Sequence, residues 1–198
     1  MAQIPRVLSI AGTDPTGGAG VQADLKAIAA AGGYGMSVTT ALVAQNTQGV
    51  REIHTPPQSF LRAQLDAVFD DVAVDAVKIG MLGDTETTHT VADYLAVRPV
   101  PVVVVDPVMV ATSGDRLLSA DAEAALRQLV ADHATVVTPN IPELAVLTDE
   151  PEPDSFDAAV ELGRRYAREA DVQVLVKGGH LSGERASNAL VAPDGSAH

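Results

Sequence analysis

Four consecutive valines, Val102–Val105, form the strongest strand signal in the chain. The run is apolar on both sides, which is typical of a strand that is buried on both faces at the centre of a parallel sheet. Parallel strands need long crossover connections, and these are usually helices. The run therefore predicts an α/β fold, with a strand that ends at Asp106.

Short apolar runs and amphipathic segments alternate along the chain. The apolar residues of segment 21–29 recur at helical spacing, for example, and Gly32 and Gly33 end that helix. This alternation predicts a mostly parallel central sheet with helices on both faces, in one domain over residues 1–198. Ser59 and Ser119 are expected to cap helices. We expect strands, with the loops that they run into, at 7–10, 36–43, 51–55, 75–83, 102–109, 134–138, 172–179 and 188–191.

Composition limits the function classes. The 198 residues carry a net charge of −13, which argues against nucleic acid and anionic membrane surfaces as partners. Cysteine is absent, so disulfides and thiolate nucleophiles are excluded within this sequence. No apolar run approaches the roughly 18 residues of a membrane span, and no secretory signal pattern is visible. The expected location is cytoplasmic.

A glycine-rich segment, Ala11–Asp24, joins the first strand to the first helix, a position where α/β proteins bind ligands. The P-loop interpretation fails because Gly18 stands where the phosphate-binding lysine belongs. Residues 18–23 meet the dinucleotide pattern nominally, but no acidic residue follows about 20 positions later to hold a ribose. A plain structural turn stays open as the alternative.

Polar side chains gather at the predicted carboxyl ends of several strands, the edge where open α/β sheets bind ligands. Two of the three lysines of the chain are among them. The positions are Asp14, Asp24, Gln45, Asn46, Lys78, Asp106, Asn140, Glu143 and Lys177.

Four of these side chains suit phosphoryl transfer from a nucleotide. Such a reaction needs a cation near the transferred group and a carboxylate that orients the acceptor hydroxyl, and Lys177, Asp106, Asn140 and Glu143 can supply most of this. Asn140 and Glu143 lie three residues apart at a helix start, where they can hold metal-bound waters. The same spacing is that of a capping box, so both interpretations stay open.

Six motifs, in order from about residue 6 to residue 191, resemble the hydroxymethylpyrimidine/phosphomethylpyrimidine kinases of thiamine biosynthesis, members of the ribokinase-like superfamily. The resemblance implies a three-layer ribokinase-like fold. It rests on Ala11–Lys26 (AGTDPTGGAGVQADLK), Thr40–Gly49 (TALVAQNTQG), Lys78–Leu82 (KIGML), Asp106–Met109 (DPVM), Thr138–Glu143 (TPNIPE) and Lys177–His180 (KGGH).

The resemblance implies ATP- and Mg²⁺-dependent phosphorylation of 4-amino-5-hydroxymethyl-2-methylpyrimidine and then of its monophosphate. It assigns Lys177 to the transferring phosphate. It places Asp106, Asn140 and Glu143 at the magnesium–phosphate region, with Asp106 and Glu143 as metal ligands. Gln45 is expected to read the aminopyrimidine edge. The residues expected around the ring are Gly12, Asp24, Val43, Met81 and Val108.

One family motif is missing from this sequence. In the family, a Gly-Thr-Gly-Cys segment follows the Lys-Gly-Gly-His motif and opens a helix whose amides form an anion hole. The sequence contains no such segment up to His198, so we expect a C-terminally truncated kinase domain. Such a chain is expected to bind the pyrimidine but to phosphorylate it poorly.

Other functions compete with this one. A pyridoxal kinase of the same superfamily also phosphorylates a hydroxymethyl group on a nitrogen heterocycle. A non-catalytic pyrimidine-binding fragment is the alternative from a different class. A dehydrogenase is disfavoured by the missing ribose-binding acid. A homodimer is left open by the sequence.

Overall fold

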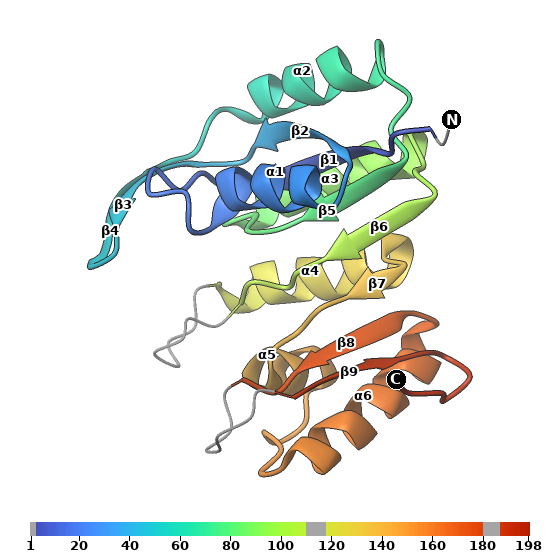
Figure 1. Cartoon of the computed structure of the whole chain (residues 1–198). Helices are drawn as coiled ribbons and strands as arrows, with labels where there is room; N and C mark the ends of the chain where they lie inside the picture. The colour runs from blue at the N-terminus through green and yellow to red at the C-terminus, as the bar shows by residue number, and fades with distance from the viewer. Residues whose placement is uncertain (1–2, 110–117, 180–186) are drawn as a thin grey trace. The chain divides into compact units, whose positions relative to one another are not determined.

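The chain divides into two units, Met1–Val103 and Val104–His198, in a computed structural model that describes residues 3–109, 118–179 and 187–198 (Figure 1). In the described part, no helix is long and apolar enough to cross a membrane. Each unit holds parallel strands with helices packed against them, so the predicted α/β class with a mostly parallel sheet is confirmed.

The first unit is built on three parallel strands in the order β2-β1-β5. Helix α1 packs against β1 and β2, whereas α2 packs against β2 and α3. In Figure 1, α1 lies in front of these strands and α3 lies behind them, so helices cover both faces. The elements are β1 (Arg6–Ala11), α1 (Gly20–Ala30), β2 (Tyr34–Thr39), β3 (Leu42–Asn46), β4 (Gly49–His54), α2 (Gln58–Phe69), β5 (Ala76–Ile79) and α3 (Thr85–Val97).

The core of this unit lies between β1 and its neighbours. Leu8 and Ile10 of β1 and Val77 and Ile79 of β5 are fully buried. The register aligns Leu8 with Val77 and Ile10 with Ile79, so the four side chains come from matched positions of adjacent strands. This alignment brings the carboxyl ends of β1 and β5 to the same edge of the sheet.

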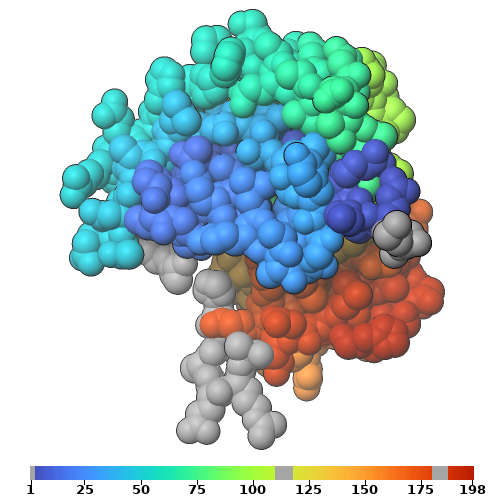
Figure 2. All heavy atoms as spheres, turned by 45° about the horizontal axis from the view of Figure 1, so that its top comes forward, coloured from blue at the N-terminus to red at the C-terminus, as the bar shows by residue number. Residues whose placement is uncertain are grey.

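An antiparallel hairpin, β3–β4, replaces part of the strand that we expected at 36–43. The expected strand is confirmed over 36–39 and wrong beyond, because β2 ends at Thr39, where the buried Thr40 donates its hydroxyl to the Met81 carbonyl at 2.7 Å. The polar residues Gln45 and Asn46 lie in β3. Every residue of β4 is exposed, and Figure 2 shows the cyan spheres of this region standing out from the rest of their unit.

Helix starts show where capping predictions hold. Ser119 accepts a hydrogen bond from the Ala122 amide and caps α4, as predicted. The prediction for Ser59 is wrong, because α2 already begins at Gln58 after Pro57. The fixed φ of proline suits the start of a helix, and proline has no backbone N–H that would need a hydrogen-bond partner there.

The second unit arranges its strands in the order β6-β7-β8-β9. Pairing is parallel from β6 to β8, whereas β9 runs antiparallel to β8. Helix α6 packs against α5, β8 and β9. The elements are β6 (Val102–Val105), whose first two residues belong to the first unit, α4 (Ala120–His133), β7 (Val136–Val137), α5 (Ile141–Thr148), α6 (Phe156–Ala170), β8 (Gln173–Lys177) and β9 (Asn188–Val191).

Gly20 is the glycine whose replacement we expect to be costly. Its φ is 57°, and a Cβ atom there would lie 2.4 Å from the Gly12 carbonyl oxygen. Gly20→Ala is expected to lower the free energy of unfolding by about 2 kcal/mol. Gly32 is the matched control, because its φ of 83° is also positive but a Cβ atom there would meet no atom within 4 Å. In urea denaturation, equal losses for both variants would contradict the contact argument.

Candidate functional site

Three of the residues predicted around the pyrimidine, Gly12, Val43 and Met81, come together in the first unit. A Cβ atom on Gly12 would lie 2.6 Å from Met81 Cε and 3.7 Å from Val43 Cγ2, so these three residues lie next to one another. The Thr13 hydroxyl accepts a 2.9 Å hydrogen bond from the Val43 amide, and the Thr13 amide donates to the Ala41 carbonyl at 2.9 Å. The glycine-rich loop is therefore hydrogen-bonded to β3.

Asp24, another predicted substrate residue, lies in a polar network. Its Oδ2 accepts a 2.7 Å hydrogen bond from the fully buried Ser9 hydroxyl and lies 3.1 Å from Lys78 Nζ. The network joins α1 to the neighbouring strands β1 and β5. Because both partners hold the same carboxylate oxygen, they fix the orientation of the Asp24 side chain.

Asp14 organises the glycine-rich loop, and the sequence alone indicated no specific role for it. The residue is 3% exposed and accepts hydrogen bonds from the amides of Thr16, Gly18 and Ala19 at 2.8–2.9 Å. The pKa of Asp14 lies well below its usual range. The Gln45 side chain lowers it most, the hydrogen bonds from Thr16 and Ala19 lower it as well, and burial opposes them. These backbone amides therefore donate to the Asp14 carboxylate and are not available to bind a phosphate.

A cavity of about 410 Å³ opens between this loop and the hairpin. Its volume falls within the range of small-molecule pockets, and most of its wall is apolar. Val43 is the predicted substrate residue in its wall. The lining is formed by Thr13, Pro15, Leu42, Val43, Ala44, Glu52 and His54.

The second unit brings together the residues predicted for phosphate chemistry. Lys177 Nζ lies 2.9 Å from Asp106 Oδ1, and the Thr138 hydroxyl donates to the same oxygen at 3.1 Å. Asp106 follows β6, Thr138 follows β7, and Lys177 ends β8. Three adjacent parallel strands thus deliver these side chains to one edge. The Lys177 amide also donates to the Pro139 carbonyl at 3.1 Å, which ties the end of β8 to the turn before α5.

Asn140 and Glu143 form the capping box that the sequence left as one of two interpretations. Asn140 Oδ1 accepts from the Glu143 amide at 2.8 Å, and Glu143 Oε2 accepts from the Asn140 amide at 2.9 Å. The pKa of Glu143 is raised to about 7, chiefly by burial and also by the nearby Asp106, although the Asn140 amide and Lys177 lower it. The carboxyl group is therefore close to the Lys177–Asp106 pair, and its role toward a metal stays a prediction.

Hard oxygen ligands are what Mg²⁺ prefers, and Asp106 and Glu143 are of this kind. Among the described residues, no group of three or more His, Cys, Asp or Glu side chains is placed to hold a metal. The two carboxylates fit Mg²⁺ all the same, because that ion is usually bound by one or two carboxylates together with waters and substrate phosphates. Val108 is half-buried in this unit, and its role stays a prediction. His180 lies outside the described residues.

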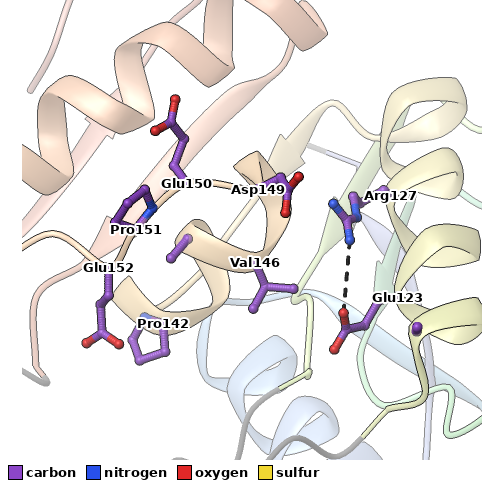
Figure 3. Close-up of a pocket in the computed structure, with 10 residues that line it drawn as sticks. Glu123, Arg127, Pro142, Val146, Asp149, Glu150, Pro151 and Glu152 are labelled. Atoms are coloured by element: carbon purple, nitrogen blue, oxygen red, sulfur yellow. Dashed lines mark ion pairs between the residues drawn. The ribbon is translucent and has the colours of Figure 1, made fainter.

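A larger cavity, of about 640 Å³, lies in the second unit between α4 and the end of α5 (Figure 3). None of the predicted site residues lines it. Arg127 points toward Glu123 there, at 4.0 Å. The wall also carries Asp149, Glu150 and Glu152, whose charges oppose the binding of a nucleotide phosphate. This cavity is therefore no candidate for the nucleotide site.

The chain is similar to known proteins over most of its length. Residues 14–198 match the family described as phosphomethylpyrimidine kinase. A thiamine biosynthesis multifunctional protein, ThiED, of Corynebacterium efficiens is 64% identical over 98% of this chain, which spans 26% of that protein's length. The hydroxymethylpyrimidine/phosphomethylpyrimidine kinase of Escherichia coli is 47% identical over 95% of this chain and 71% of its own length.

Solved structures share the fold. The crystal structure of phosphomethylpyrimidine kinase from Clostridium difficile superposes with a TM-score of 0.90 at 38% identity, covering 98% of this chain and 83% of its own. An ADP complex of Bacillus subtilis pyridoxal kinase gives 0.86 at 31% identity, covering 99% and 73%. These ribokinase-like kinases and the match over residues 14–198 agree with the predicted resemblance, and the chain belongs to the phosphomethylpyrimidine kinase family.

Proposed function

We propose that the protein phosphorylates 4-amino-5-hydroxymethyl-2-methylpyrimidine, and then its monophosphate, with ATP and Mg²⁺. The observation that carries this proposal is the Lys177–Asp106 pair, 2.9 Å apart, beside Glu143 at the carboxyl ends of parallel strands. A lysine and carboxylates in this place suit phosphoryl transfer. Family membership and the kinase names of the relatives support the same reaction.

Different residues of this chain would bind the nucleotide and assist the transfer of its phosphoryl group. Lys177 would stabilise charge on the transferred phosphoryl group, and Asp106 would orient the acceptor hydroxyl. Asn140 and Glu143 would hold the nucleotide side, with Asp106 and Glu143 as metal ligands. When bound, Mg²⁺ would neutralise phosphate charge.

The pyrimidine would lie against the first-unit residues that converge on the glycine-rich loop. Gly12, Val43 and Met81 would give it apolar contacts, while Asp24 and Gln45 would meet its polar groups. The role of Val108 as a ring contact stays a prediction. A single kinase domain, a cytoplasmic location and a homodimer remain predictions.

Pyridoxal kinase is the second candidate, because the solved pyridoxal kinase with ADP has the same fold at 31% identity. A non-catalytic pyrimidine-binding module is the third. ADP production by the whole protein with Mg-ATP separates the three when the aminopyrimidine and pyridoxal are compared as acceptors. Turnover with pyridoxal alone would support the second candidate, and binding of the pyrimidine without turnover would support the third.

Gln45→Ala is expected to weaken binding of the aminopyrimidine by about 1–3 kcal/mol, because polar groups in the pocket lose their partner. Calorimetric titration of the pyrimidine into the whole protein measures the loss. Gln48→Ala is the control, since Gln48 lies exposed in the turn of the same hairpin. An unchanged affinity in Gln45→Ala would remove Gln45 from the binding site.

A further inference from the structure

A fully buried threonine, Thr40, is hydrogen-bonded to the ends of two neighbouring strands. Its hydroxyl group donates to the Met81 carbonyl at 2.7 Å, and its amide donates to the Ala11 carbonyl at 3.0 Å. Thr40 directly follows β2, Ala11 ends β1, and Met81 comes two residues after β5. Because β2, β1 and β5 are adjacent in the sheet, one residue joins the carboxyl ends of three parallel strands.

Met81 lies in a loop, beyond the hydrogen bonds of the sheet. The last bond on this side of the sheet is the one from the Gly80 amide to the Ile10 carbonyl, at 2.9 Å. Among the described residues, the backbone from Met81 to Gly83 takes part in one hydrogen bond, which is the bond from Thr40. A carbonyl that loses its donor in a buried place costs free energy. The Thr40 hydroxyl therefore fixes the backbone from which the Met81 side chain extends.

The Met81 side chain reaches from this loop to the glycine-rich loop. A Cβ atom on Gly12 would lie 2.6 Å from Met81 Cε and 3.6 Å from the Ala41 carbonyl oxygen. Ala41 directly follows Thr40, and the same carbonyl accepts a 2.9 Å hydrogen bond from the Thr13 amide. The two groups that face Gly12 are thus held by Thr40 itself and by the residue next to it.

We propose that Thr40 is a positioning residue for substrate binding, whose hydroxyl group holds Met81 against Gly12 so that the two form one wall of the ring site. The inference rests on the proposed function, in which Gly12 and Met81 give the pyrimidine ring apolar contacts, and it deepens that function. Thr40 is 0% exposed, so it reaches a ligand only through Met81. Without the hydroxyl the loop that carries Met81 loses its anchor, and the ring loses apolar contacts.

Thr40→Val tests the proposal in the whole protein. Valine keeps the branched shape of threonine but lacks the hydroxyl, so the Met81 carbonyl loses its donor. Calorimetric titration of 4-amino-5-hydroxymethyl-2-methylpyrimidine should give a dissociation constant about tenfold higher than that of the unaltered protein. Thr40→Ser restores the hydroxyl group without the methyl group, and it should restore most of the affinity.

Thr88→Val is the matched control. Thr88 is 2% exposed in the same unit and donates its hydroxyl to the Asp84 carbonyl at 2.8 Å, but it belongs to α3 and contributes no predicted ring contact. Its replacement removes a comparable buried hydrogen bond and should leave the affinity unchanged. An equal loss of affinity in Thr40→Val and Thr88→Val would indicate general damage to the unit and overturn the proposal.

If Thr40→Val does not fold, the exchange of hydroxyl protons in the unaltered protein decides. A bond that favours ligand binding is itself stabilised by the ligand, because coupling is reciprocal. Nuclear magnetic resonance should therefore show slower exchange of the Thr40 hydroxyl proton when the pyrimidine is bound, with no change for Thr88. An exchange rate of the Thr40 proton that the pyrimidine does not alter would overturn the proposal.

The outcomes separate this proposal from the proposed function. Unchanged affinity in Thr40→Val, or affinity in Thr40→Ser as weak as in Thr40→Val, overturns the role of the Thr40 hydroxyl and leaves the proposed function intact. Failure of the unaltered protein to bind the pyrimidine overturns both.

Discussion

Lys177→Met is expected to lower turnover of the whole enzyme by about a hundredfold or more, with little change in the affinity for the pyrimidine. Lys177 lies at the end of β8 against Asp106 in the second unit, whereas the residues proposed to hold the pyrimidine ring lie mainly in the first. A cation that acts on charge developing in the transition state affects kcat far more than binding. Steady-state kinetics and direct titration of the pyrimidine measure the two effects separately.

Lys78→Met is the matched control for this variant. Lys78 is also a lysine at a strand end, 3.1 Å from an aspartate, but its partner Asp24 belongs to the proposed substrate side. Its replacement should change pyrimidine affinity more than turnover. If Lys177→Met lowered affinity and turnover by the same factor, Lys177 would be a structural lysine that supports the end of β8.

Glu143→Gln is expected to change how stability depends on pH. Folding raises the pKa of Glu143 from its ordinary value of 4.5 to about 7 because the side chain is buried. Between these values the folded chain holds a proton that the unfolded chain has lost, so the free energy of unfolding falls as pH rises through this window. The total fall due to this group is about 3 kcal/mol. The substituted glutamine does not titrate, so that part of the pH dependence would vanish.

Glutamine is the right replacement because it can still serve in a capping box. Urea denaturation of both proteins at several values between pH 4.5 and 7.5 gives the difference in stability at each pH. A chelator should be present, since a bound cation would favour the ionised carboxylate. A stability difference that stayed constant across this range would contradict the assigned pKa of Glu143.

The parts of the fold that could be predicted are those with one dominant physical signal. A run such as Val102–Val105 has few alternatives to a buried strand, and the interspersed helical periodicity indicated the α/β class. The strand expected at 51–55 overlaps β4, but the break between β2 and β3 was missed, so the pairing of β3 with β4 as a hairpin was not predicted. Its start depends on the tertiary contact from Thr40 to Met81, which no local pattern contains.

The residues of the candidate site could likewise be predicted only in part. The Lys177–Asp106 pair was predictable because parallel strands bring their carboxyl ends to one edge. Asn140 and Glu143 were ambiguous, since a capping box and a pair of ligands have the same spacing, and the structure shows the former. The role of Asp14 was not predicted, although an aspartate before Pro-Thr-Gly-Gly is a recognisable Asx-turn signal.

The exposed hairpin has a consequence for the energetics of ligand binding. An isolated two-stranded ribbon is marginally stable in water, so β3 depends on the hydrogen bond from the Val43 amide to the Thr13 hydroxyl of the glycine-rich loop. Such a segment opens locally at a lower free energy than the rest of the molecule unfolds. Because Val43 lies both on β3 and in the wall of the cavity, each opening disrupts the cavity, and a ligand that binds there would stabilise the closed state by its binding free energy. The cavity therefore forms when the hairpin is ordered and is lost when the hairpin opens.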